Sequence, residues 1–199
     1  MRKTTLIKRL LLVSLLALLL SGCGTSRSAL IVKDDPMKII ERGGITIALR
    51  FLDEDTLKVK YGPANNPFLT YYTSLQLNRI MVFELSVKAA DAPVLLSLSR
   101  MELQFGNRIA KPIDAFGLSE YWKSRDQYSQ DKNPDTAKKE LLARRELLPY
   151  ETRIEPQTRL NKLVVFMENL PQYGKCTVYL PLFSESKQPL DTLQFDFQF

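Results

Sequence analysis

The stretch Ile45-Thr46-Ile47-Ala48-Leu49-Arg50-Phe51 shows the pattern that decides the fold of this chain. Its apolar side chains recur at every second position, which is the period of a β-strand with one buried face. The same alternation returns over residues 81–87 and 193–199, whereas residues 163–167 are apolar at every position. An uninterrupted apolar run of this length indicates a strand buried on both faces. We therefore expect antiparallel sheets with residues 163–167 near the centre.

One further strand is predicted over residues 57–61. Leu57, Val59 and Tyr61 alternate with two lysines, directly after the acidic triplet Asp53-Glu54-Asp55. The triplet is interpreted as a solvated turn. A calcium site is disfavoured because Leu57 stands where a calcium loop would continue its oxygen ligands.

The alternation changes phase between residues 94 and 105. Apolar side chains occupy even positions before Ser99-Arg100 and odd positions after it. One inserted residue sends every later side chain to the opposite face, so we expect a β-bulge here. Gly106-Asn107 then predicts a tight hairpin turn.

Residues 118–148 lose the alternation, are dense in charge, and predict a helical insertion. Ser119 is a candidate N-cap for a short first helix. Asn133-Pro134-Asp135 supplies an N-cap, a first-turn proline and an acidic residue for a second helix that ends near residue 148. The narrow apolar stripe of this second helix places it on a surface, with the stripe formed by Ala137, Leu141 and Leu148.

The insertion carries Tyr121, Trp122, Arg125 and Tyr128, which are the candidate partner-contact residues of this chain. Aromatic and arginine side chains are enriched in protein interfaces, and functional residues often lie in segments presented by a rigid sheet. The alternative is structural: Tyr121 and Trp122 clamp the insertion onto the sheet. The sequence leaves both interpretations open.

Taken together, about eight strands and one helical insertion predict a mainly β fold, an antiparallel immunoglobulin-like β-sandwich. Residues 37–199 are expected to form it as a single domain, with 118–148 inserted. The cysteine and tryptophan signature of true immunoglobulin domains is absent. The architecture thus rests on periodicity.

The amino-terminal segment has the organisation of an export signal. Residues 1–9 contain four basic and no acidic side chains, and residues 10–20 are apolar apart from Ser14. As a helix, this apolar run would rise only about 16 Å, roughly half the hydrocarbon core of a bilayer. Residues 1–22 therefore predict a cleaved signal peptide instead of a membrane span.

The signal ends in Leu20-Ser21-Gly22-Cys23, which resembles the lipobox of bacterial lipoproteins. The resemblance implies a diacylglycerol on the Cys23 sulfur, cleavage after Gly22 and acylation of the new amino terminus. Several acyl chains anchor stably where one holds only marginally. Membrane lipid is thus the expected partner of Cys23, and residues 23–36 are expected to form the lipidated terminus and tether.

The resemblance also suggests a location. If the host has two membranes, Gly24 lacks the aspartate that resembles an inner-membrane retention signal. We therefore expect the outer membrane, with the domain facing the periplasm.

Composition excludes several classes of function. Of the 28 basic residues, four lie in the signal, which leaves 24 against 22 acidic residues and gives no support for nucleic-acid binding. The chain has no histidine, which removes histidine-dependent nucleophilic catalysis and the usual zinc sites. It also lacks a glycine-rich phosphate loop. No catalytic residue, metal or cofactor is predicted.

Two weak patterns keep a hydrolase as the first alternative. Ser184 and Lys187 have the spacing of a serine nucleophile and its basic partner, but Pro189 follows and the companion motifs are missing. Glu151 and Glu155 form the second pattern, a pair of carboxylates whose separation nothing in the sequence fixes. We interpret all four residues as surface or turn positions.

The carboxyl-terminal aromatics give a second alternative. Phe195, Phe197 and Phe199 alternate as in the last strand of an outer-membrane β-barrel. A barrel needs many strands of about ten residues, and few segments here are that long. We expect a last strand packed in the sandwich core.

Cys176 is the remaining cysteine once Cys23 carries lipid, and it falls in phase with the apolar residues Val178 and Leu180. A buried, inert thiol is expected. The leading functional prediction is a non-catalytic envelope lipoprotein that binds or assembles with an envelope protein of unknown identity.

Overall fold

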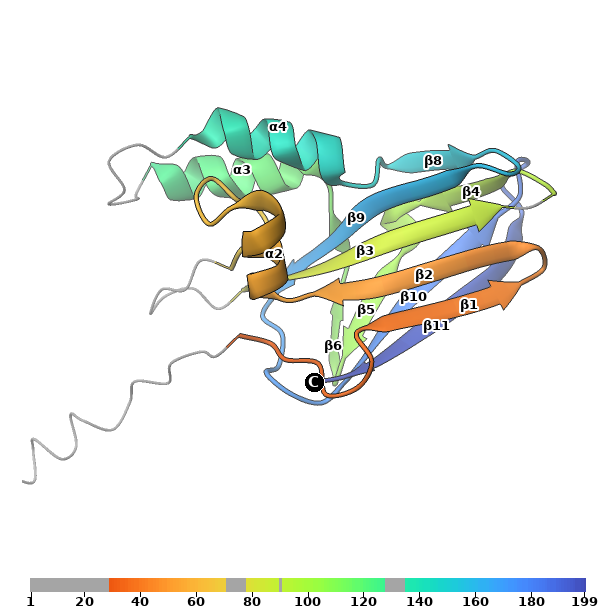
Figure 1. Ribbon diagram of the computed structural model, residues 1–199, viewed down its shortest axis with the longest axis horizontal. Coiled ribbons are helices and arrows are strands. Elements are labelled where there is room, and N and C mark those ends of the chain that lie inside the picture. Colours follow the sequence, from red (N-terminus) through yellow and green to blue (C-terminus); the bar gives the residue numbers. More distant parts are fainter. Residues whose placement is uncertain (1–28, 71–77, 90, 128–134) are drawn as a thin grey trace, which may run out of the picture.

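The computed structural model describes residues 29–70, 78–89, 91–127 and 135–199. Two antiparallel sheets face each other, and three helices gather against one of them (Figure 1). The predicted mainly β sandwich is confirmed. No helix among the described residues is long and apolar enough to cross a membrane.

The first sheet, sheet A, is built from long hairpins. Its strands lie in the order β1 (Met37–Arg42), β2 (Ile45–Leu52), β3 (Arg79–Ala89), β9 (Arg159–Glu168) and β7 (Pro112–Ile113). The β3–β9 pair holds register over ten residues, from Arg79 opposite Glu168 to Lys88 opposite Arg159.

The second sheet, sheet B, is centred on β10. One side of β10 (Lys175–Phe183) pairs with β11 (Pro189–Gln198), and the other pairs with β4 (Val94–Ser97) and β5 (Glu102–Phe105). The outer partners of β4 and β5 are β8 (Glu151–Ile154) and β6 (Arg108–Ala110).

This strand order is that of an immunoglobulin-like sandwich. Strands β2, β3, β9 and β7 take the places of strands A, B, E and D, with β1 added at the edge. The β4–β5 segment, β10 and β11 take the places of C, F and G. The chain changes sheets after β3, β6, β7, β8 and β9. Strand β8, which follows β7 in sequence but lies in sheet B, is an addition to this topology.

Phenylalanine rings from both sheets meet in the space between them. The Phe83 ring on β3 lies 6.0 Å from that of Phe166 on β9 and 5.2 Å from that of Phe197 on β11. Phe195, Phe197 and Phe199 are each 1% exposed. The last strand therefore belongs to the sandwich core, as the alternation predicts.

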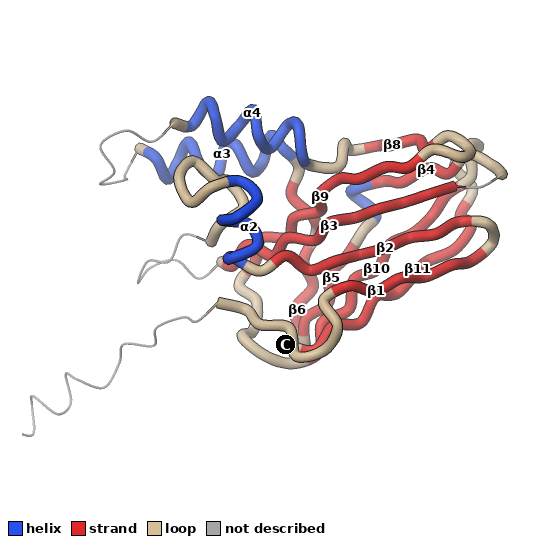
Figure 2. The backbone as a smooth tube through the Cα atoms, viewed as in Figure 1, coloured by secondary structure: helices blue, strands red, loops and turns tan. Residues whose placement is uncertain are grey.

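A second hydrophobic core lies on the outer face of sheet A. Three helices cover one end of this face: α2 (Glu54–Tyr61), α3 (Ala115–Asp126) and α4 (Thr136–Glu146) (Figures 1 and 2). Val82 and Val165 point into this second core, whereas Phe83 and Phe166 point into the first. Burial of residues 163–166 on both faces is thereby confirmed.

The predicted strand over 57–61 is wrong, because these residues form α2. The Asp53 side chain caps this helix by accepting a hydrogen bond of 2.7 Å from the Thr56 backbone N–H, and Glu54 and Asp55 occupy the first turn. Leu57 is buried while Val59 is 89% exposed. Three alternating residues are too few to separate a strand from a helix, and the cap signal decides.

The two helices of the insertion begin at aspartates. Asp114 caps α3 through a 2.7 Å bond from the Gly117 N–H, and Asp135 caps α4 through a 3.0 Å bond from the Lys138 N–H. Ser119, the expected cap, is 3% exposed inside α3. The expected cap at Asn133 lies outside the described residues.

The phase change and the hairpin turn take their expected positions. A 3-10 turn (Leu98–Arg100) separates β4 from β5 and carries the phase shift, in place of a simple bulge. Phe105 pairs with Arg108 across the hairpin, and Gly106 has a φ of 61°, a region that favours glycine.

Residues 30–34, which were expected to belong to a tether over residues 23–36, pack against the domain. Leu30 is 8% exposed and belongs to the main core. Lys33 donates its backbone N–H to the Gln198 carbonyl at 2.7 Å, and Asp34 accepts from the Gln198 N–H at 3.1 Å. Apolar burial and these bonds fix residues 30–34 along β11, so they do not act as a flexible linker.

Candidate functional site

Trp122, one of the candidate contact residues, is part of the second core. It is 6% exposed, and its indole N–H donates a 2.9 Å hydrogen bond to the Pro67 carbonyl. The bond joins α3 to the segment that follows α2. Trp122 is therefore no exposed anchor, and its position agrees with the clamp interpretation.

A buried polar cluster fastens α3 to α4 beside this indole. Lys139 forms a 2.7 Å ion pair with Asp126, and the two side chains are only 9% and 8% exposed. Its ammonium also lies 4.1 Å from the centroid of the Trp122 ring. The other oxygen of Asp126 accepts a 2.6 Å hydrogen bond from the Thr136 hydroxyl. The cluster accounts for the burial of Lys139 in α4.

The other candidate contact residues are only partly accessible. Tyr121 and Arg125 are half-buried, and the Arg125 guanidinium lies 5.4 Å from the Tyr121 ring centroid. Tyr128 lies outside the described residues. The structure thus brings Tyr121, Trp122 and Arg125 together on α3, but Trp122 faces the sheet.

Helices α3 and α4 present other apolar side chains to solvent. Phe116 on α3 is 66% exposed, and Leu141 on α4 is 70% exposed. The sequence-based stripe that included Ala137 and Leu141 is wrong, since Lys139 and Ala143 are the buried residues of α4. The ion pair between Lys139 and Asp126 sets the orientation of α4. The spacing of apolar residues along the helix does not predict this orientation.

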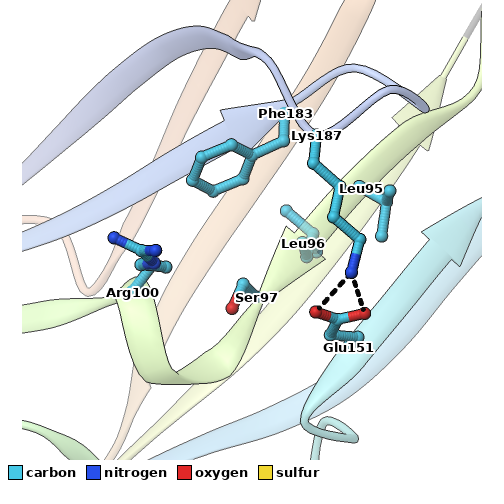
Figure 3. A pocket seen from close by; sticks show the side chains of 7 residues that line it. All are labelled: Leu95, Leu96, Ser97, Arg100, Glu151, Phe183 and Lys187. Carbon is cyan, nitrogen blue, oxygen red and sulfur yellow. Dashed lines mark hydrogen bonds and ion pairs between the residues drawn. The ribbon is translucent and has the colours of Figure 1, made fainter.

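A small cavity lies on sheet B beside the β10–β11 turn. It has a volume of about 100 Å³ and is lined in part by the apolar side chains of Leu95 and Phe183. Figure 3 shows Arg100 on one side of it and an ion pair on the other. In that pair, Lys187 Nζ lies 3.0 and 3.1 Å from the two carboxylate oxygens of Glu151.

The cavity brings together two of the four hydrolase candidates, Lys187 and Glu151. Their arrangement matches neither the serine–lysine pattern nor the pair of carboxylates. The Lys187 ammonium is engaged by Glu151, while the Ser184 hydroxyl lies 2.9 Å from that of Ser186 and accepts from the Gln188 N–H at 3.1 Å. The fourth candidate, Glu155, instead pairs with a neighbouring arginine. The two glutamates therefore belong to separate ion pairs.

The remaining lining residues of this cavity, Arg100 among them, were not predicted as site residues from the sequence. Arg100 is exposed and makes no ion pair within the part of the chain that the structure describes. Arg100 lines one side of the cavity (Figure 3), together with apolar side chains such as Leu95 and Phe183, a combination suited to receiving an acidic or aromatic side chain. The 3-10 turn at residues 98–100 places Arg100 there, and the phase change in the sequence marked that position.

Neither a metal centre nor a reactive thiol is found among the described residues. These residues contain no group of three acidic or cysteine side chains that could hold a metal ion. Cys176 is fully buried on β10, as predicted, and burial raises the pKa of its thiol to about 12.

Fold and surface define a helix-covered immunoglobulin-like sandwich with a small, positively charged cavity. No protein-family model matches the chain, and no curated protein matches it. Among solved structures, it is similar to a crystal structure of a candidate lipoprotein (ycdA) from Bacillus subtilis, with 10% identity and a TM-score of 0.41. The match covers 82% of this chain and 39% of that protein. A likeness at this level carries no argument about function.

Proposed function

We propose that this protein is a membrane-anchored lipoprotein of a bacterial envelope whose sandwich acts as a non-catalytic binding or assembly module. The observation that carries the proposal is Leu20-Ser21-Gly22-Cys23, the lipobox-like end of an export signal. The described chain supports it, because a core residue, Leu30, follows Cys23 after only six residues. The proposed lipid anchor thus lies close in sequence to the folded domain.

In a host with two membranes, the proposed location is the outer membrane, with the domain in the periplasm. Gly24 occupies the position after the lipidated cysteine and lacks the charge of a retention signal. Fractionation that places the protein with inner-membrane markers would overturn this location while leaving the anchor intact.

A binding role is supported by the charge pairing of the polar side chains that line the cavity. Lys187 and Glu151 neutralise one another, whereas Arg100 has no charge partner among the described residues. A cavity of about 100 Å³ fits one side chain of a partner better than a substrate that must be enclosed. Exposed Phe116 on α3 and Leu141 on α4 provide a second candidate contact.

Lipidation is tested with Cys23→Ala. The wild-type protein should fractionate with membranes, and its mature amino terminus should be an acylated Cys23 by mass spectrometry. The variant should accumulate as an unprocessed or unacylated form. An unmodified amino terminus at a different residue of the wild-type protein would contradict the proposal.

The partner is sought with photo-crosslinking side chains in intact cells. Position 100 probes the cavity, and positions 116 and 141 probe the exposed faces of α3 and α4. Position 190 is the control because Leu190 is 53% exposed on β11. Discrete crosslinked proteins at a probe position and none at 190 would support a binding module. Equal, diffuse crosslinking at all four positions would count against it.

A further inference from the structure

The proposed anchor leaves little freedom between membrane and domain. This inference rests on the proposed function, in which Cys23 carries the acyl chains. Seven Cα–Cα steps separate Cys23 from Leu30, and they limit the span to about 25 Å even when fully extended. A ten-residue strand such as β9 is about 33 Å long. The end of the sandwich at which the chain enters therefore stays within about 25 Å of the membrane.

Hydrogen bonds identify the segments at the anchored end. The Lys33 N–H donates to the Gln198 carbonyl, and Gly174 and Phe199 exchange two backbone hydrogen bonds of 3.0 Å each. The chain after Leu30, the β9–β10 loop and the carboxyl-terminal residues thus lie together (Figure 1). We call this the proximal end and define it as residues 30–33, 171–175 and 198–199.

Two large side chains of the proximal end are left in solvent. Ile31 and Tyr173 are each 72% exposed, although Leu30 and Phe199 beside them are buried. Single exposed apolar residues are common on soluble proteins and need no explanation by themselves. What is informative here is the position of this pair, because both flank the point where the anchored chain enters the domain.

The charges near this entry point are mixed. Lys33 is exposed, and Glu54 lines the same small cavity as Leu30. Because both signs occur, attraction to anionic lipid cannot be the main force at this surface. Aliphatic and tyrosine side chains instead suit the boundary between headgroups and acyl chains, where tyrosine is enriched.

We propose that the proximal end rests in the headgroup layer of the membrane that holds Cys23, with Ile31 and Tyr173 inserted at its surface. The opposite end carries the β10–β11 turn and the cavity of Figure 3. This orientation points the cavity away from the lipid. The membrane contact and the candidate partner contact thus occupy opposite ends of the sandwich.

The test uses the full-length acylated protein in vesicles of phosphatidylethanolamine and phosphatidylglycerol. Ile31→Cys and Tyr173→Cys are labelled with an environment-sensitive fluorophore, and Gln188→Cys in the β10–β11 turn is the matched exposed control. Buried Cys176 should not react with the label. Quenching by lipids with a nitroxide on the headgroup should be several-fold stronger at 31 and 173 than at 188, and should persist in high salt.

Mass spectrometry of each preparation separates the two proposals. If Cys23 is acylated and quenching is equal at the three positions, or strongest at 188, the proximal-end contact is overturned and the lipoprotein stands. A label that is shielded at 31 or 173 without quenching by lipid would mean that a second copy of this chain covers this end, which also overturns the contact. If Cys23 carries no lipid, both proposals fall.

Discussion

Trp122 illustrates how one residue can take a different role from the one its type suggests. A lone tryptophan in a charged segment is typical of an interface, but here the ring is enclosed by the second core and its N–H is bonded to Pro67. Truncation would leave a cavity and an unpaired carbonyl. Trp122 therefore contributes to the stability of the fold.

We expect Trp122→Ala to lower the free energy of unfolding by about 3–5 kcal/mol, because a large buried ring is lost. Urea denaturation measures this. The matched control is Phe116→Ala on the same helix, where the ring is 66% exposed and the change should stay within about 0.5 kcal/mol. Comparable losses for the two variants would mean that the buried face of α3 is assigned wrongly.

Cys176 predicts a dependence of stability on pH. Burial raises the pKa of its thiol from 9.0 to about 12, so above pH 9 the unfolded state releases the proton before the folded state does. The unfolded state then binds fewer protons, and stability falls as pH rises from 9 towards 12. The contribution is about 1.4 kcal/mol per pH unit.

Cys176→Ala isolates this contribution, since the titration of tyrosines and lysines is common to both proteins. The difference in free energy of unfolding between wild type and variant should shrink steadily as the pH is raised. A difference that is constant with pH would indicate that the thiol is accessible to water.

At the scale of elements, the edge strand β1 shows how the sheet limits pairing with other chains. Lys38 is opposite the buried Leu49 and therefore faces inwards, with its ammonium 5.7 Å from the Phe197 ring centroid and 2.6 Å from Asp34. An inward-facing charge on an edge strand disfavours a further strand beside it. The same lysine also ties the strand to the segment that precedes it.

The α3–α4 pair depends on its buried ions. Lys139→Ala should lower the free energy of unfolding by about 3–5 kcal/mol, because Asp126 would be left as an uncompensated charge in the second core. Its neighbour provides the control: Lys138 pairs with Asp135 at the surface, and Lys138→Ala should change stability little. Replacing both Asp126 and Lys139 with leucine should recover much of the loss, whereas a double variant as unstable as Lys139→Ala would contradict this account.

At the scale of the molecule, the two sheets are joined through their phenylalanine core. Phe166 belongs to sheet A and Phe197 to sheet B, and both rings surround Phe83. Phe166→Ala and Phe197→Ala should each cost about 3–5 kcal/mol in chemical denaturation. Because the rings share a neighbour, the double variant should depart from additivity. Losses within about 0.5 kcal/mol would mean that these faces point outwards.

The sequence alone predicted those parts of the fold that depend on a local pattern of apolar residues. Period-two alternation identified the long strands and their inward faces, and the apolar run at 163–167 located the strand buried on both sides. The export signal ending at Cys23 also rests on a local pattern, and it stays a prediction. The alternation predicts these strands correctly because each strand is long enough for the period of two to be distinguished from a helical period.

Tertiary structure alone decided the features that depend on distant partners. The Asp53 cap of α2 is a local signal, but the burial of Leu57 in the second core depends on contacts with distant parts of the chain. Trp122 turned inwards because Pro67, 55 residues earlier, accepts its N–H. Arg100, Glu151 and Lys187 meet at one cavity only because sheet B brings three separate segments together. Contacts between residues far apart in the chain leave no period in the sequence, so only the folded molecule shows them.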